Sequence, residues 1–418
     1  MTVKNVAVIG GGHAGDEVVA QLRERGFAGS VTLIEETLHI PYERPPLSKE
    51  FLTHHLEPSA LTIRGAAFYQ QHDTTHRLGV AVVGMDPAES HVRLHFDGGS
   101  TEDFDAVVWA TGMQPRELPV PGADAAGVHY LQGLTDATAI RDSLATVGAA
   151  VVIGGGFIGA ETAASLRTLG KDVTLIEHGA RLMARAVSEP ISHFYENAHH
   201  AAGVRLLLES GVTSIDASSE GLVSGVRTSD GELIPSDCVI ASVGVSPRTE
   251  IAHKAGLEVD RGFLVVNAQG QSSHPRVYAV GDIALFPHPR GTTPRTPIPS
   301  LDNASWSAGV VAGALMGDNP PERRAVPTFW TEQFGQRTQI AGLLTTRDHS
   351  VTRGDPSTGE FLVLHYQEEK LIAVEAIGAA QDFQAVKKAI ELDITIPTDL
   401  AGWDDLSLTD FVASLATP

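Results

Sequence analysis

VAVIGGGHAGDEVVAQLRERGFAGSVTLIEE, residues 6–36, holds a strand, a glycine-rich turn, a helix, a second strand and an acid in that order. The apolar residues 6–9 are typical of a buried parallel strand. Glycines at this spacing permit a tight turn and let backbone N–H groups approach a pyrophosphate at the positive end of the helix. An acid after the second strand can accept both ribose hydroxyls. This order predicts a Rossmann-type dinucleotide site, with candidate contacts Gly10, Gly12, Ala14, Gly15, Glu35 and Glu36.

The same order of elements returns in residues 151–177, VVIGGGFIGAETAASLRTLGKDVTLIE. Two such patterns in one chain imply two dinucleotides. We expect one to be a tightly held flavin, FAD, and the other an exchanging nicotinamide nucleotide. The candidate nicotinamide-nucleotide contacts are Gly154, Gly156, Phe157, Ile158, Gly159 and Glu177.

Two acids of this second unit carry further predictions. Glu177 is followed by a His-Gly dipeptide and not by a basic pair, so a 2′-phosphate would meet a carboxylate. This favours NADH over NADPH, although Arg181 and Arg185 follow closely. Glu161 lies two residues beyond the last glycine, on the helix expected to face the nicotinamide. The alternative role for Glu161 is that of a carboxylate stabilised by the helix macrodipole.

The composition excludes two classes of partner. The 418 residues include 30 Lys and Arg against 51 Asp and Glu, a net charge of −21. This charge argues against nucleic acid, since phosphate binding needs clustered basic residues. No uninterrupted apolar run reaches the roughly 18 residues of a membrane span, and the first strand begins without a signal peptide before it. We therefore expect a cytoplasmic protein with no membrane partner.

The chain has one cysteine, Cys238, in the apolar run CVIASVGV. A buried structural thiol is the expected state in such a strand-like run. A single thiol allows no intrachain redox disulfide, no C-x-x-C pair and no Cys-ligated cluster. No metal site is predicted, and any electrons that move through the chain must be carried by the flavin.

PYERPPLSKEF, residues 41–51, follows the first dinucleotide unit. Its prolines predict that no helix forms before Ser48, which is expected to be an N-cap. The segment comes at the carboxyl end of the second strand, where doubly wound sheets bind their ligands. Arg44 and the neighbouring Pro45 are therefore candidates for the pyrophosphate, and Lys49 for the flavin ring. A surface salt bridge is the alternative role for Arg44 and Lys49.

Three further strand ends carry small residues that would let a ligand approach the backbone. The strand-like run 104–109 is followed by Ala-Thr-Gly at 110–112, and the apolar run that begins at Cys238 leads to the similar Ser-Val-Gly at 242–244. Prolines after the first of these predict a domain crossing, and the second is expected to be the return crossing. The strand-like run 277–282 ends in Gly-Asp, where the acid suits the hydroxyls of a ribityl chain. The candidate contacts are Ala110, Thr111, Gly112, Gly244, Gly281 and Asp282.

From Pro327 the pattern changes to short alternating runs such as 361–366 and 371–377, with a helical pattern at 383–392. This predicts a compact antiparallel sheet with one helix, a third domain. An Asp-Gly-Gly turn at 97–99 also predicts a hairpin in the first domain.

The ordered set GGGHAG, PYERPPLSK, WATG, GGGFIGAE, YAVGD and FWTEQF resembles the FAD-dependent ferredoxin reductases that supply cytochromes P450 and ring-hydroxylating oxygenases. The resemblance covers essentially the whole chain. It implies an α/β, glutathione-reductase-like fold with two Rossmann-type domains and a C-terminal α+β interface domain. The expected boundaries are 1–114 and 243–324 for a split FAD-binding domain, 115–242 for the NAD-binding domain, and 325–418 for the interface domain.

The resemblance also implies site residues. A Lys49–Glu161 pair would lie beside the flavin, with Trp330 near its ring, and these three are the candidate catalytic residues. Further FAD contacts implied by the resemblance are Val82, Arg116 and Leu301. The chain departs from the family pattern at Pro297-Ile298-Pro299, where an Arg-x-Glu is usual, and at Ser307, where Gln is common.

The predicted function is that of an NADH-dependent ferredoxin reductase. Hydride from NADH would pass to FAD, and single electrons would pass to a [2Fe–2S] ferredoxin, expected to be acidic. This partner would dock over Trp330 and nearby arginines, because residues 283–353 hold seven Arg against five acids. The alternatives are another acceptor (rubredoxin, a quinone or monodehydroascorbate) and a redox sensor like apoptosis-inducing factor. Thiol-dependent relatives are disfavoured because residues 38–47 hold no cysteine.

Overall fold

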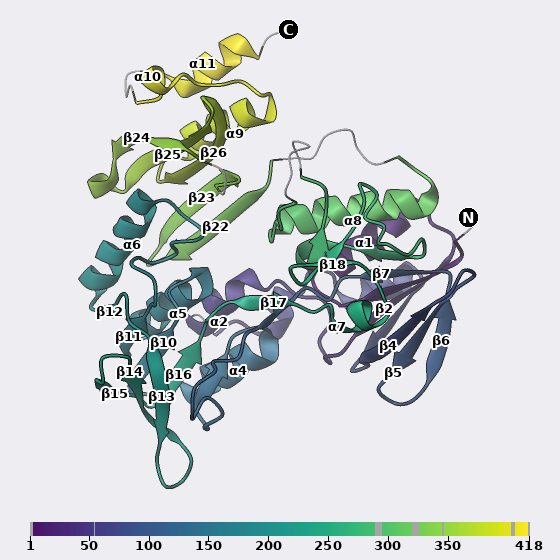
Figure 1. Ribbon diagram of the computed structural model, residues 1–418, viewed down its shortest axis with the longest axis horizontal. Coiled ribbons are helices and arrows are strands. Elements are labelled where there is room, and N and C mark those ends of the chain that lie inside the picture. The colour runs from purple at the N-terminus through teal and green to yellow at the C-terminus, as the bar shows by residue number, and fades with distance from the viewer. Residues whose placement is uncertain are drawn as a thin grey trace. The chain divides into compact units, whose positions relative to one another are not determined.

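The computed structural model describes residues 3–53, 55–288, 295–319, 326–344, 347–402 and 406–416. The chain forms two compact units, each of mixed α/β structure (Figure 1). Unit 1 comprises Met1–Glu43, Pro58–Gln114 and Val245–Ala325. Unit 2 comprises Arg44–Glu57, Pro115–Gly244 and Val326–Pro418.

Unit 1 is built on a five-stranded parallel sheet in the order β20-β7-β1-β2-β3. Successive side chains of a strand point to opposite faces, so Val6 and Val8 enter one core and Ala7 and Ile9 the other. Helices α1 and α8 cover the first face and lie side by side (Figure 1). The elements are β1 (Asn5–Ile9), α1 (His13–Glu24), β2 (Ser30–Glu35), β3 (Thr74–Leu78), β7 (Ala106–Trp109), β20 (Val277–Ala279) and α8 (Leu301–Met316).

The second face of this sheet packs against smaller antiparallel elements. The predicted turn at 97–99 is confirmed, since it joins β5 to β6 and the N–H of Gly99 donates to the carbonyl of Phe96 at 2.9 Å. The elements of this layer and of its connections are β4 (Val82–Pro87), β5 (Val92–Phe96), β6 (Thr101–Phe104), β17 (Val245–Pro247), α7 (Glu250–Lys254), β18 (Val259–Asp260), β19 (Phe263–Val265) and β21 (Ala284–Leu285). Unit 1 also contains the 3-10 helices η2 (Pro58–Leu61) and η3 (Gly281–Ile283), the helix α3 (Ala66–Gln71), and most of β8 (Met113–Pro115).

The central part of unit 2 repeats this design. Its parallel sheet has the order β12-β11-β10-β16-β9, and β10, α5 and β11 correspond to β1, α1 and β2. The predicted repeat of the dinucleotide unit is therefore confirmed. The elements are β9 (Val128–Tyr130), α4 (Leu134–Ser143), β10 (Ala149–Ile153), α5 (Phe157–Thr168), β11 (Asp172–Ile176), α6 (Glu189–Ala202), β12 (Arg205–Leu207), β13 (Val212–Ala217), β14 (Val223–Thr228), β15 (Leu233–Pro235) and β16 (Cys238–Ala241).

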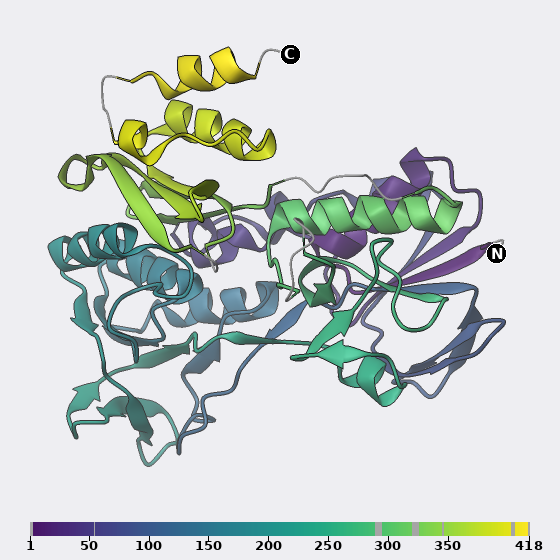
Figure 2. The ribbon, with the colours of Figure 1, turned by 45° about the horizontal axis from the view of Figure 1, so that its top comes forward.

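The C-terminal part of unit 2 is the predicted antiparallel sheet, in the order β22-β23-β26-β25-β24. Helix α9 packs on one of its faces and α11 packs on α9, around a separate apolar core (Figure 2). The predicted helix begins three residues earlier than expected, at Ala380. The elements are β22 (Thr328–Gln333), β23 (Gln336–Gly342), β24 (His349–Asp355), η4 (Pro356–Thr358), β25 (Glu360–Gln367), β26 (Lys370–Ile377), α9 (Ala380–Glu391), α10 (Thr398–Ala401) and α11 (Leu408–Leu415).

The segment Arg44–Glu57 belongs to unit 2, whereas the sequence division grouped it with residues 1–114. It forms the 3-10 helix η1 (Pro45–Ser48) and the short helix α2 (Glu50–Thr53). Phe51 and Leu52 are fully buried, and the guanidinium of Arg141 in α4 lies 4.4 Å from the ring centroid of Phe51. These contacts explain the grouping. The predicted boundaries of three domains stay a prediction.

The expected N-cap at Ser48 is wrong. Ser48 is the last residue of η1, and Lys49 separates it from α2. Prolines are tolerated here because the first N–H groups of a helix have no intrahelical acceptor, so Pro45 and Pro46 begin η1 instead of preventing it. The hydroxyl of Ser48 is thereby free to bond elsewhere. Within the described ranges, no helix is both long and apolar enough to cross a membrane.

Candidate active site

The glycine-rich turn of unit 1 is fixed by close backbone contacts. Gly10 has φ 105°, and a Cβ there would lie 2.5 Å from the carbonyl oxygen of Ala110. A Cβ at Gly15 would overlap the carbonyl oxygen of Gly10. Both positions therefore require glycine for packing within the chain. Gly12 is the N-cap of α1 and no side chain caps it, which leaves the first N–H groups of the helix for a ligand.

Glu35, the acid at the end of β2, closes this turn. Its Oε2 accepts from the N–H of Gly11 at 2.6 Å, and its Oε1 accepts from the N–H of Thr37 at 3.0 Å. The neighbouring Glu36 is exposed and forms an ion pair with Arg248, in which Nη2 lies 3.0 Å from Oε2. Sequence reasoning missed Arg248, since 212 residues separate the pair and no local pattern links them.

The predicted FAD contacts at residues 110–112 and 281–282 follow β7 and β20, at the same edge of the parallel sheet as the turn after β1. A Cβ at Gly281 would lie 2.8 Å from the Cβ of Ala14, so the start of η3 touches the first turn of α1. The N–H of Gly281 donates to the hydroxyl of Ser307 at 2.9 Å, which gives the unusual serine a structural role. The hydroxyl of Thr111 donates to the carbonyl of Arg248 at 2.9 Å. The remaining predicted contacts of this unit are half-buried: Val82 begins β4, Gly112 follows β7, Asp282 lies in η3 and Leu301 begins α8.

The turn of unit 2 has the same construction. A Cβ at Gly154, where φ is 104°, would overlap the carbonyl oxygen of Ser242, and a Cβ at Gly159 would overlap that of Gly154. Gly156, by contrast, has open space where its Cβ would lie. It is the N-cap of α5 and has no side-chain cap. The first and last glycines thus serve packing, while the middle one leaves room for a ligand to approach the backbone.

Glu177 closes this second turn as Glu35 closes the first. Its Oε2 accepts from the N–H of Gly155 and its Oε1 from the N–H of Gly179, both at 2.6 Å. In the sequence, Arg181 was a basic residue that could favour binding of NADPH. In the structure it donates to Ser192 Oγ at 2.6 Å and to the carbonyl of Val187 at 3.1 Å. Its guanidinium is therefore engaged within the loop, while Arg185 is exposed.

Replacing Glu177 with Ala is expected to narrow the preference for NADH. The carboxylate would accept a hydroxyl of the NADH ribose and repel the 2′-phosphate of NADPH. Loss of one such hydrogen bond corresponds to about a tenfold change in binding. The measurement is the ratio of kcat/KM for NADH to that for NADPH. An unchanged ratio would contradict the ribose contact.

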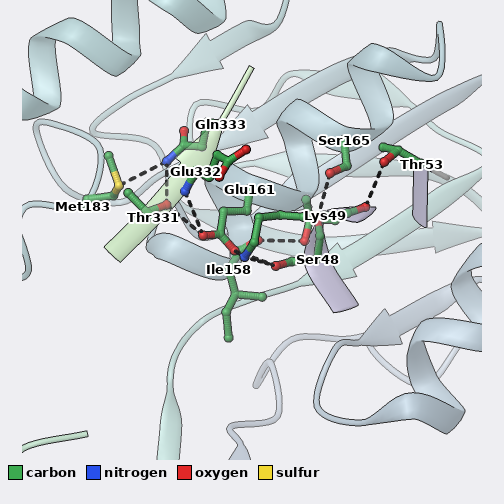
Figure 3. Close-up of polar contacts among 11 residues, drawn as sticks. Ser48, Lys49, Thr53, Ile158, Glu161, Ser165, Met183, Thr331, Glu332 and Gln333 are labelled. Atoms are coloured by element: carbon green, nitrogen blue, oxygen red, sulfur yellow. Dashed lines mark hydrogen bonds and ion pairs between the residues drawn. The ribbon is translucent and has the colours of Figure 1, made fainter. Parts of the chain in front are cut away.

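A buried polar cluster in unit 2 surrounds the carboxylate of Glu161 (Figure 3). Its Oε2 lies 2.8 Å from Lys49 Nζ and accepts from Ser48 Oγ at 2.5 Å. Its Oε1 accepts from Thr331 Oγ1 at 2.8 Å. The side chains of Glu161 and Lys49 are 6% and 14% exposed, so this is a largely desolvated ion pair. The predicted Lys49–Glu161 pair is therefore present, and Ser48 and Thr331 are members that the sequence did not reveal.

The start of α5 presents an apolar side chain next to this cluster. Ile158 is 41% exposed, and Figure 3 shows its side chain pointing away from the polar group. Phe157 beside it is half-buried. An exposed apolar residue at an uncapped helix start suits contact with the flat face of a nicotinamide.

Trp330 is half-buried on β22, and the guanidinium carbon of Arg337 lies 5.6 Å from its ring centroid. Of the other arginines predicted to form a docking surface, Arg353 is 7% exposed and pairs with Asp382, so it is not part of an open surface. Arg295 donates to the carbonyls of Leu285, in β21, and of Val266, and Arg347 donates to the carbonyl of Leu344 in its own loop. Arg290, Arg323 and Arg324 lie outside the described residues.

Arg44, predicted to bind the pyrophosphate, and Arg116, a further FAD contact implied by the resemblance, are both exposed. Arg44 precedes η1, is exposed, and forms no ion pair with the described residues. Arg116 is also exposed, and its N–H donates to the carbonyl of Gly244 at 2.9 Å, so the two predicted crossing segments meet. The exposed position of Arg44 leaves its guanidinium available to an anion.

Cys238 is 1% exposed in β16, as predicted. Burial raises the pKa of its thiol to about 11, so the reactive thiolate is scarce at neutral pH. The chain therefore has no thiol suited to the chemistry of disulfide reductases or peroxidases.

His199 in α6 is fully buried, and burial lowers its pKa to about 4. It is neutral in the folded and unfolded chains above about pH 6.5 and makes no pH-dependent contribution there. Between about pH 6.5 and 4 the unfolded chain binds a proton that the folded chain does not, so stability falls as pH falls. We expect the native chain to lose about 2 kcal/mol more than His199→Phe between pH 7 and pH 5. Urea unfolding of both at the two pH values measures this, and equal losses would contradict it.

Family comparisons agree with this geometry. Residues 4–308 match the model of the family described as pyridine nucleotide-disulphide oxidoreductase, and residues 328–412 match that described as reductase C-terminal. The chain belongs to the pyridine nucleotide-disulphide oxidoreductase family. This family membership confirms the predicted oxidoreductase class, the two dinucleotide cofactors and the two-Rossmann fold.

Relatives place the chain among the ferredoxin reductases of this family. It is 37% identical to a ferredoxin–NAD(P)(+) reductase of Sphingomonas sp. over 391 residues, which cover 93% of this chain and 92% of the relative. It is 33% identical to a rubredoxin–NAD(+) reductase of Pseudomonas putida over 388 residues, which cover 93% and 99%. A chain of the crystal structure of the covalent putidaredoxin reductase–putidaredoxin complex matches with a TM-score of 0.95 and 32% identity. The match covers 100% of this chain and 100% of that chain.

Proposed function

We propose that this protein oxidises NADH with bound FAD and passes the electrons singly to a [2Fe–2S] ferredoxin that serves an oxygenase or a cytochrome P450. The observation that carries the proposal is the buried Lys49–Glu161 pair, whose Glu161 lies on α5, the helix that follows the second glycine-rich turn. The ferredoxin reductase among the relatives supports the choice of acceptor.

The two glycine-rich turns fit the dinucleotides by their open, uncapped helix starts. Bound FAD would supply the conversion between a two-electron hydride donor and a one-electron carrier. Glu35 and Glu177 would accept ribose hydroxyls, and Arg44 would bind the pyrophosphate. Ile158 would exclude water from the face of the nicotinamide.

Lys49 would place a positive charge beside the flavin ring, where negative charge develops during reduction. Glu161 Oε2, at 2.8 Å, and Ser48 Oγ, at 3.4 Å, hold its ammonium at one position, so little reorganisation is needed during the reaction. No side chain of this cluster has to act as a nucleophile or a general acid. The half-buried Trp330 with Arg337 over it would contact an acidic acceptor.

We also propose that the protein acts in the cytoplasm. Its single buried thiol is compatible with a reducing compartment, because it takes part in no disulfide.

A comparison of acceptors tests the proposed function. The purified flavoprotein is mixed anaerobically with NADH and, in equal amounts, with an oxidised [2Fe–2S] ferredoxin, a rubredoxin or a quinone. The proposal expects the ferredoxin to be reduced fastest. Fastest reduction of rubredoxin would favour the alternative that the rubredoxin–NAD(+) reductase relative represents. Slow transfer to all three from a long-lived NAD-bound state would favour a redox sensor.

A further inference from the structure

The carboxylate of Glu161 is held from the side opposite Lys49 by the C-terminal sheet. Thr331 in β22 donates its hydroxyl proton to Glu161 Oε1 at 2.8 Å, and the N–H of Glu332 approaches the same oxygen at 3.4 Å. An ionised carboxylate only accepts hydrogen bonds, so the hydroxyl proton of Thr331 must point to Glu161. The lone pairs of Thr331 Oγ1 are then left to accept from another group.

That donor is the side-chain amide of Gln333, two residues along the same face of β22. Its Nε2 donates to Thr331 Oγ1 at 3.2 Å and approaches the sulfur of Met183 at 3.4 Å. A thioether sulfur is a weak acceptor and not a donor. Both neighbours therefore require the NH₂ group of Gln333 on this side, which turns its Oε1 the other way.

Gln333 Oε1 lies 2.9 Å from Nε2 of His199 in α6. Since the amide oxygen can only accept, the imidazole must carry its proton on Nε2. Its other ring nitrogen, Nδ1, is buried and has no hydrogen-bond partner within the described structure. Burial lowers the pKa of His199 to about 4, so the imidazole is neutral at physiological pH. In the series His199, Gln333, Thr331 and Glu161, each residue therefore donates a hydrogen bond to the next.

The members of this row are closed to water. His199 and Thr331 are 0% exposed, Gln333 is 2% exposed and Glu161 is 5% exposed. In a dry site a hydrogen bond is stronger, and losing one leaves a buried group unpaired. Rotation of the Glu161 carboxylate would break its contact with Thr331, so the row fixes the orientation in which Oε2 faces Lys49.

We propose that Thr331, Gln333 and His199 are positioning residues that hold Glu161, and through it Lys49, in the geometry required for oxidation of NADH. This inference rests on the proposed function and deepens it. It makes the C-terminal sheet a part of the nicotinamide site. Strand β22 carries Trp330 on one face and Thr331 with Gln333 on the other, so one strand serves both the predicted acceptor surface and the positioning row.

Thr331→Val tests the proposal because it removes the hydroxyl while keeping a branched side chain of similar size. Anaerobic stopped-flow absorbance at several NADH concentrations separates the limiting rate of flavin reduction from the dissociation constant of NADH. We expect the limiting rate to fall about tenfold, the effect of one lost hydrogen bond, with the dissociation constant unchanged. Thr331→Ser restores the donor and is expected to restore the rate. The midpoint potential of the FAD is expected to become more negative in Thr331→Val, because a displaced Lys49 stabilises the reduced flavin less.

Thr338→Val is the matched control. Thr338 is a buried threonine of β23 whose hydroxyl lies 2.9 Å from Tyr195 Oη, outside the row. It is expected to keep the native rate and potential. Equal loss in both variants would overturn the proposal, as would a native rate in Thr331→Val. If Thr331→Val fails to fold with FAD, Gln333→Leu, one position further along the row, takes its place with the same expected outcomes.

The tautomer of His199 gives a readout independent of turnover. NMR of the ¹⁵N-histidine-labelled protein, with His199→Phe for assignment, is expected to show a proton on Nε2. A proton on Nδ1 would reverse the row and overturn the proposal.

If the native protein itself is not reduced by NADH, the proposed function fails, and the positioning role fails with it. Native reduction that is unaffected by Thr331→Val overturns the positioning role alone.

Discussion

Replacing Glu161 with Gln is expected to slow the reduction of bound FAD by NADH by about two orders of magnitude, in the range found when a preorganised electrostatic contact is removed. The amide keeps the size of the side chain but removes the charge that pairs with Lys49. It also directs an NH₂ group at donors, because one carboxylate oxygen accepts from Ser48 and Lys49 and the other from Thr331. Lys49 would leave its position, and the charge beside the flavin would be misplaced.

FAD retention is expected to stay near native in this variant, since the glycine-rich turn of unit 1 is untouched. The measurements are the rate of flavin bleaching on mixing with NADH and the ratio of FAD to protein after purification. Glu189→Gln, at an exposed position of α6, is the control and should match the native protein in both. Parallel loss of FAD and of the reduction rate would contradict the assigned role of Glu161.

Gly156→Val is expected to lose NADH binding and keep its stability, whereas Gly154→Ala is expected to lose stability. Gly156 has open space at its Cβ position, so a β-carbon meets no atom of the chain, and the valine side chain would occupy the room left for a pyrophosphate. Losing one or two hydrogen bonds to a charged group there weakens NADH binding by about a hundredfold. Stability should be nearly native. Gly154 has φ 104° and its Cβ would overlap the carbonyl of Ser242, so alanine strains the fold by about 3 kcal/mol or more.

Titration of each variant with NADH and urea unfolding together measure these effects. Gly170→Ala is a useful control, because Gly170 has φ 77° and open space around it, so it should lose some stability through backbone strain and keep NADH binding. Native affinity in Gly156→Val would show that the open space at this turn is not used by the nucleotide.

Much of the fold could be predicted from the sequence because its signals are local. Each dinucleotide turn is encoded within about 30 residues, in glycines whose backbone contacts exclude a side chain, as at Gly10 and Gly154. The alternating runs of the C-terminal sheet are local in the same way. The error at Ser48 arose from treating prolines as helix breakers at positions where the first turn of a helix tolerates them.

The rest of the candidate site depends on residues far apart in the chain. Ser48 and Thr331 meet at Glu161 across separations of 113 and 170 residues, and nothing in the sequence near either position indicates this. The ion pair between Glu36 and Arg248 is of the same kind. Such pairings follow from the packing of whole elements, and only the arranged fold reveals them. The resemblance to ferredoxin reductases supplied the pairing of Lys49 with Glu161, which the structure contains.

In the proposed function, the protein takes a hydride from NADH and releases the two electrons one at a time. Anaerobic stopped-flow absorbance tests it most directly, with the yellow protein mixed first with one equivalent of NADH and then with excess oxidised [2Fe–2S] ferredoxin. We predict rapid bleaching of the flavin, followed by its reoxidation at the rate at which ferredoxin is reduced, with two ferredoxin molecules reduced for each NADH. Rapid bleaching without any reduction of ferredoxin would contradict it.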